Sequence, residues 1–95
     1  MRKAKAHAKQ VEVKGIRLSL RIGEHDLQVR RDQSKRFMDD GNRVRVEIIL
    51  KGRERQHVDL ARKILEEFVV SLQDVRVDQP FAKQGGVLSM VVAKK

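Results

Sequence analysis

The sequence predicts an α+β domain, a two-layer sandwich in which two helices pack on one face of a mixed four-stranded sheet in the order β-α-β-α-β-β. Several stretches alternate apolar with polar residues, which is typical of half-buried strands. Between them, apolar residues recur at helical spacing. Two helices can cover only one face of a four-stranded sheet, so the other face should be open to solvent.

The first element expected is a strand over residues 11–22. Arg17 and Arg21 fall on its polar side, and its apolar side comprises Ile16, Leu18, Leu20 and Ile22. Residues 1–10 carry four basic side chains and no core pattern, so we expect a flexible basic arm there. The folded domain is therefore assigned to residues 11–95.

A first helix is expected between Gly23 and Gly41, because Gly23 ends the strand and Gly41 is a helix C-cap signal. Its apolar face is weak. Leu27, Ser34 and Met38 share it with Arg31, which should lie at its margin. Two carboxylates, Asp39 and Asp40, fall at the negative end of this helix, where the nearby Arg43 is expected to offset them.

The clearest strand covers residues 43–51 and turns inward Val44, Val46, Ile48 and Leu50. Gly52 then turns the chain into a second helix over residues 53–72. The apolar positions of that helix are Val58, Ala61, Leu65, Phe68, Val69 and Leu72. On its polar face, i, i+4 pairs are expected between Asp59 and Lys63, Arg62 and Glu66, and Lys63 and Glu67. We interpret Arg62 and Lys63 as a solvated face.

The chain should close with a hairpin. Val75 and Val77 begin its first strand, and Pro80, which lacks an amide hydrogen, places that strand at an edge. Gly85 and Gly86 mark the turn before a final strand over residues 87–93. Helices between strands favour parallel pairing, whereas the short glycine turn favours an antiparallel pair.

Charge indicates the kind of partner. The chain has 22 basic and 13 acidic residues, a net charge of +9 and a pI of about 10.5. This balance is typical of a protein that binds a polyphosphate. The open face is expected to be basic and relieved only by Glu47, with Arg17, Arg21, Arg43, Arg45 and Lys51 upon it. Three Phe and no Tyr or Trp leave little for stacking bases, which favours phosphate contacts to folded RNA.

Other classes of protein fit poorly. The chain has no cysteine, which excludes a disulfide framework, and its three histidines are too scattered for a metal site. His25 and Asp26 are adjacent, but no nucleophile lies nearby in sequence, so we expect a helix-start role. We therefore predict a monomeric, cytoplasmic binding protein without enzymatic activity, cofactor, small-molecule substrate or membrane partner.

Five segments together resemble a known family. They are HDLQVR at 25–30, RFMDDG at 36–41, RVRV at 43–46, KGRERQH at 51–57 and MVVAKK at 90–95. In this order and spacing they resemble the C-terminal domain of bacterial translation initiation factor 3, over about residues 11–95. Residues 1–10 resemble the end of that family's interdomain linker. The resemblance implies binding to rRNA of the small ribosomal subunit and a block on premature joining of the large subunit.

The resemblance also implies contact residues. The family's basic residues match Arg30 and Arg36 on the first helix, and its basic-Gly-Arg-Glu turn matches residues 51–54. With the basic residues of the strands, the predicted RNA contacts are Arg30, Arg36, Lys51, Gly52, Arg53, Arg17, Arg21, Arg43, Arg45 and Lys14. Asp32, Glu67 and Gly86 stand where the family typically has arginine, so the basic surface could be shifted.

Two alternative functions stay open at this point. One is an RNA-binding domain of the same fold that acts on non-ribosomal RNA or in rRNA processing. The other is a protein-interaction domain whose basic sheet face meets an acidic partner.

Overall fold

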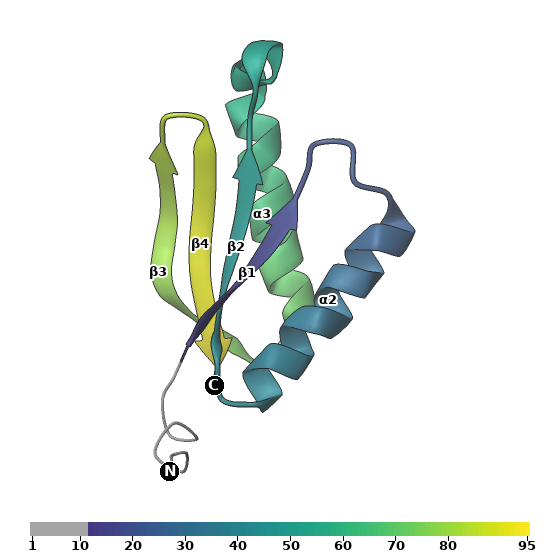
Figure 1. Ribbon diagram of the computed structural model, residues 1–95, viewed down its shortest axis with the longest axis vertical. Helices are drawn as coiled ribbons and strands as arrows, with labels where there is room; N and C mark the ends of the chain where they lie inside the picture. Colours follow the sequence, from purple (N-terminus) through teal and green to yellow (C-terminus); the bar gives the residue numbers. More distant parts are fainter. Residues whose placement is uncertain (1–11) are drawn as a thin grey trace, which may run out of the picture.

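The computed structural model describes residues 12–95, so the arm predicted for residues 1–10 lies outside it. The element order agrees with the prediction (Figure 1). The elements are β1 (Val13–Leu18), α2 (Glu24–Asp39), β2 (Arg43–Ile49), the 3-10 helix η1 (Gly52–His57), α3 (Val58–Leu72), β3 (Val75–Gln84) and β4 (Val87–Lys94). The loop after β1, the η1 segment and the β3–β4 turn all lie at the top of Figure 1, at one end of the sheet.

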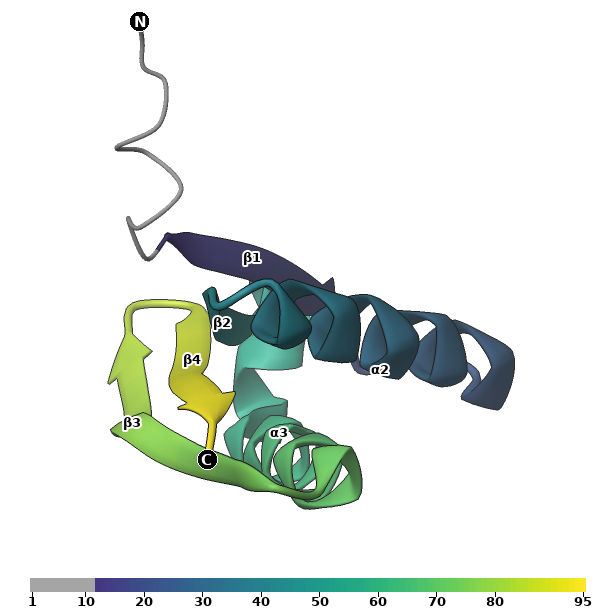
Figure 2. The same ribbon diagram turned by 90° about the horizontal axis from the view of Figure 1, so that it is seen from below.

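The sheet is mixed, as predicted, with strand order β1-β2-β4-β3. β1 runs parallel to β2, whereas β4 is antiparallel to both β2 and β3. Figure 2 shows α2 and α3 on the same side of the sheet. The other side carries no helix among the described residues, which confirms the two-layer sandwich with one open face.

The core lies between the sheet and the two helices. Alternate residues of β2 point into it, and Val44, Val46 and Ile48 are fully buried. The α3 residues expected to face the sheet do so, with Ala61, Leu65, Phe68, Val69 and Leu72 buried. Burial of this apolar stripe, rather than helix propensity, is what holds α3 in place.

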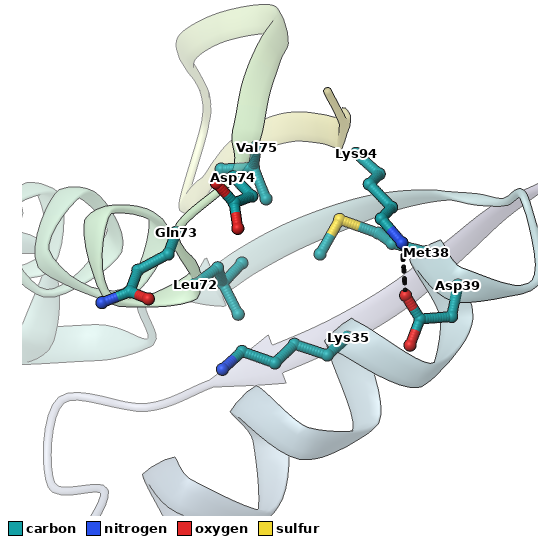
Figure 3. Close-up of a pocket in the computed structure, with 8 residues that line it drawn as sticks. All are labelled: Lys35, Met38, Asp39, Leu72, Gln73, Asp74, Val75 and Lys94. Carbon is teal, nitrogen blue, oxygen red and sulfur yellow. Dashed lines mark hydrogen bonds and ion pairs between the residues drawn. The ribbon is translucent and has the colours of Figure 1, made fainter.

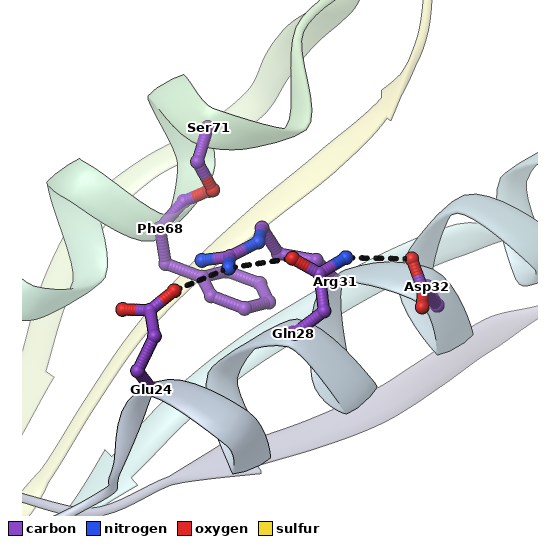
Figure 4. Close-up of polar contacts among 6 residues, drawn as sticks. All are labelled: Glu24, Gln28, Arg31, Asp32, Phe68 and Ser71. Carbon is purple, nitrogen blue, oxygen red and sulfur yellow. Dashed lines mark hydrogen bonds and ion pairs between the residues drawn. The ribbon is translucent and has the colours of Figure 1, made fainter.

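The weak apolar face of α2 is confirmed. Ser34 is fully buried, and its hydroxyl donates to the Arg30 carbonyl at 2.8 Å, so its burial leaves no unsatisfied polar group. Arg31 lies at the margin of this face, with its side chain 16% exposed. Its guanidinium donates to Glu24 at 2.8 Å and to Gln28 at 2.9 Å, beside the ring of Phe68 (Figure 4).

The first strand is shorter than predicted. β1 ends at Leu18, and a turn closed by the Ile22 amide on the Ser19 carbonyl at 3.3 Å leads into α2. Leu20 and Ile22 still pack against the core, but from this turn. The alternation therefore predicted correctly which side chains are buried but not where the strand ends, and Arg21 lies in the turn rather than on the strand.

The helix predicted over residues 53–72 is in fact two helices. Residues 52–57 form η1, and the backbone changes direction at His57, with φ −106° and ψ 37°, before α3 begins. No side chain of η1 is buried. Without an apolar residue to dock on the sheet, this segment has nothing that fixes it in the α-helical register of α3.

The final hairpin follows the prediction. β3 is an edge strand, and its register with β4 shifts between Val77 and Gln79 and again between Gln79 and Ala82, around Pro80. A proline there removes no ladder hydrogen bond from a central strand. Gly85 has φ +59°, a left-handed conformation that glycine adopts without strain, and it turns the chain into β4.

Candidate nucleic-acid interface

Four exposed arginines on the open face form what we call the arginine ladder: Arg17 on β1, Arg43 and Arg45 on β2, and Arg76 on β3. Two carboxylates divide them into pairs. Glu47 lies 3.5 Å from Arg17 and 3.7 Å from Arg45, while Asp78 lies 2.8 Å from Arg43 and 3.3 Å from Arg76. Every arginine of the ladder therefore has a carboxylate partner.

The ladder also covers part of the sheet. Because β4 lies between β2 and β3, the ion pair between Arg43 and Asp78 spans β4. Val91 and Ala93 alternate with the core residues of β4, yet each is only 7% exposed. Arginine stems commonly bury apolar surface while the charged group stays in water. The prediction that Glu47 alone relieves the open face was wrong, since Asp78 does so too.

A second group of basic residues lies at the end of the sheet where β1 and β2 finish. There Arg17, Arg21 and Arg30 line one cavity of about 370 Å³. The other residues around it are Leu18, Ser19, Ile22 and Asp26. The structure thus brings Arg30, predicted on the first helix, together with Arg17 and Arg21, both predicted on the first strand, and the one carboxylate that lines this cavity is Asp26.

The η1 turn adds further cations at the same end of the molecule (Figure 1). Lys51 and Arg53 are exposed, and neither forms an ion pair within residues 12–95. The one carboxylate of the turn, Glu54, accepts from the Lys51 amide at 3.1 Å. Gly52 has φ +55°, so a left-handed residue starts the turn. We call the residues Arg21, Arg30, Lys51, Arg53 and Arg55 the basic end.

Two predicted contacts lie elsewhere. Lys14 is on the helix side of β1, where it pairs with Glu12 at 3.0 Å and its Nζ lies 5.9 Å from the centre of the Phe37 ring. Arg36 is in the last turn of α2, whereas Arg30 lies near the middle of that helix. The ten predicted contacts therefore do not form one surface.

Sequence reasoning missed two arginines. Arg76 alternates with Val75 and Val77 along β3, and that alternation could have placed it on the open face. No sequence pattern singled out Arg55. It lies beside Gly86 only because the fold brings these two distant segments together.

One further ion pair joins the last strand to α2. Lys94 pairs with Asp39 at 2.9 Å across a cavity of about 230 Å³ (Figure 3). Its hydrogen bond to Asp39, together with the charges of Asp39 and Asp74, raises the pKa of Lys94 above its usual value. The expected offset of Asp39 by Arg43 was wrong, because Arg43 is drawn toward Asp78 instead.

The polar face of α3 is also less simple than predicted. Of the three expected i, i+4 pairs, only Arg62 with Glu66 forms within the described residues, at 3.1 Å. Arg62 is more than a solvated side chain, since its guanidinium lies 4.8 Å from the centre of the Phe81 ring on β3. It therefore helps to hold the edge strand against the helix.

The fold and these two surfaces define a small α+β domain with a cationic end suited to a polyanion. No helix among residues 12–95 is long and apolar enough to cross a membrane.

Comparison with known proteins gives the family. Residues 11–95 match the model of "Translation initiation factor IF-3, C-terminal domain", and the chain belongs to this family. It is 38% identical over 96 residues to the chloroplastic IF-3 of Galdieria sulphuraria, covering 99% of this chain and 53% of that protein. It is 34% identical over 95 residues to IF-3 of Clostridium perfringens, covering 99% and 54%. With IF-3 of Aquifex aeolicus the identity is 37% over 87 residues, covering 90% and 50%. The chain thus spans about half the length of these relatives.

Proposed function

We propose that this chain is a non-enzymatic module of translation initiation that binds rRNA of the small ribosomal subunit and blocks premature joining of the large subunit. The observation that carries the proposal is the basic end, where Lys51 and Arg53 lie without ion-pair partners in the described residues of an IF-3 family domain. We expect it to act in the cytoplasm, as a monomer and without a cofactor.

Phosphate is the ligand that suits this end of the molecule. Arginine and lysine contact phosphate oxygens through charge-assisted hydrogen bonds, and such contacts hold a protein in register on folded RNA. A cation already paired with a carboxylate must give up part of that interaction first. We therefore rank Lys51, Gly52, Arg53, Arg21 and Arg30 as primary contacts. The secondary contacts are Arg17, Arg43, Arg45 and Lys14, which are paired with carboxylates, and Arg36, which lies in the last turn of α2 away from the basic end.

Cosedimentation tests the proposal. Labelled protein is mixed with purified small subunits or purified large subunits, each with and without excess bulk transfer RNA. The proposal expects selective sedimentation with small subunits that transfer RNA does not remove. Equal sedimentation with both subunits, or complete removal by transfer RNA, would favour binding to RNA in general.

The block on subunit joining needs its own measurement. Light scattering follows the association of the two subunits as magnesium is raised, with the chain present or absent. The proposal expects slower and less complete joining at saturating protein. A variant that binds small subunits normally and leaves joining unaffected would separate binding from this activity.

A further inference from the structure

The turn between β3 and β4 is clamped beneath η1. The Leu50 amide, just after β2, donates to the Gly86 carbonyl at 2.6 Å. A Cβ atom at Gly86 would lie only 2.5 Å from the Leu50 carbonyl oxygen. Since real Cβ atoms essentially never come that close to a neighbouring atom, this position accepts no side chain without a shift of the backbone.

The space above Gly86 is taken by Arg55 of η1. Its Nε and Nη2 atoms lie 3.4 and 3.6 Å from the point that a Cβ of Gly86 would occupy. The guanidinium therefore rests on the backbone of the turn, although the residue as a whole is exposed. Within residues 12–95 it makes no ion pair, in contrast to all four arginines of the ladder.

We propose that Arg55 contacts phosphate together with Lys51 and Arg53, as the third cation of the segment 51–55, and that the β3–β4 turn positions it, so that the RNA-binding surface includes this turn. The proposal rests on the proposed function and adds one residue and one further chain segment, the β3–β4 turn, to its site. The ligand is a phosphodiester group of folded RNA.

Two physical features favour this role. A guanidinium that rests on a fixed backbone has lost part of its conformational freedom before binding, so less is lost when it meets a phosphate. Its donors are also not engaged by any carboxylate of the described residues, so a phosphate oxygen displaces no existing ion pair. Lys51 and Arg53, from the same short segment, add positive charge beside it.

The experiment compares Arg55→Ala, Arg55→Lys and the control Arg76→Ala, which removes an equal charge from an arginine paired with Asp78. We expect Arg55→Ala to weaken binding to small subunits roughly tenfold. The slope of log affinity against log salt should become shallower by about one unit. Arg55→Lys should retain most of the slope, and Arg76→Ala should change it less.

A purely structural role for Arg55 predicts a different result: a lower melting temperature with an unchanged salt slope, which would overturn the proposal. The double variant Lys51→Ala with Arg53→Ala separates this failure from that of the proposed function. If the double variant loses affinity while Arg55→Ala does not, only the role of Arg55 is refuted. If neither variant loses affinity, the basic end itself is refuted as the binding surface.

Discussion

The basic end and the open face are both rich in basic residues, but they differ in how many of those residues already have a carboxylate partner. On the open face, Glu47 and Asp78 each hold two arginines. At the basic end, Lys51, Arg53 and Arg55 form no ion pair within residues 12–95, and the nearest acid in sequence, Glu54, caps the turn. A count of basic residues therefore overestimates the open face as a binding surface.

The difference follows from secondary structure. In a sheet, side chains on neighbouring strands lie side by side, so an acidic residue in a suitable register meets cations from two strands. In the short η1 helix no residue is buried, and the residue that packs against Arg55, Gly86, has no side chain that could pair with a cation. The arginines on the strands are thus paired with carboxylates of the domain itself, whereas Lys51, Arg53 and Arg55 remain available to a ligand.

The largest expected effect comes from Lys51→Ala with Arg53→Ala. If both residues bind phosphate, small-subunit affinity should fall roughly tenfold for each of the two side chains truncated. Arg43→Ala with Arg76→Ala removes the same formal charge from the open face and should cost much less affinity. Binding titrations at one fixed salt concentration measure both. Similar losses in two folded variants would mean that net charge alone drives binding.

Gly86→Ala should cost about 1–3 kcal/mol of unfolding free energy, because the new Cβ meets the Leu50 carbonyl and the clamped turn must shift. Gly15→Ala is the matched control, since a Cβ there has nothing within 4 Å. It should stay within about 0.5 kcal/mol of the parent. Denaturant unfolding measures both changes, and equal stability of the two variants would show that the turn beneath η1 is loosely packed.

Asp78→Asn should lower stability by about 1 kcal/mol, because it weakens two partly exposed ion pairs at once. Small-subunit affinity should not fall, since the change adds one net positive charge and leaves the basic end intact. A clear loss of affinity would show that Asp78 positions Arg43 or Arg76 for RNA. Thermal unfolding and binding titration on the same preparation give both numbers.

The smallest expected effect concerns the pair of Lys94 with Asp39. Because folding raises the pKa of Lys94, its stabilising contribution is complete below the usual lysine value of 10.5. It is lost as pH rises through the raised value of the folded state. Melting temperature measured up to strongly alkaline pH should fall slightly less steeply for Lys94→Met. An identical pH dependence in both proteins would mean that the ion pair does not contribute.

Most of the fold was predictable because the residues that are apolar at alternate positions of β2 and at helical spacing in α3 are the residues that the structure buries. The ends of elements were less predictable. Leu20 and Ile22 are buried from a turn, and periodicity cannot distinguish that from a longer strand. The polar segment 52–57 carries no burial pattern at all, so its separation from α3 had no signal.

The candidate site was predictable only in part. The turn of Lys51 and Arg53 stood out by its sequence, while the pairing of Arg43 with Asp78 depends on a strand order that brings β3 within reach of β2 across β4. The position of Arg55 over Gly86 likewise depends on the packing of two distant segments. Partner choice among charged side chains is a tertiary property, and composition does not determine it.

The salt dependence of small-subunit binding tests the contrast between the two surfaces most directly. Affinity is measured over a range of salt concentrations for the parent chain, Lys51→Ala with Arg53→Ala, and Arg43→Ala with Arg76→Ala. Counterion release makes the slope of log affinity against log salt proportional to the number of phosphates neutralised. We predict a slope shallower by about two units for the first variant and nearly unchanged for the second. The reverse order, or equal slopes for the two variants, would show that the paired arginines of the open face bind the RNA.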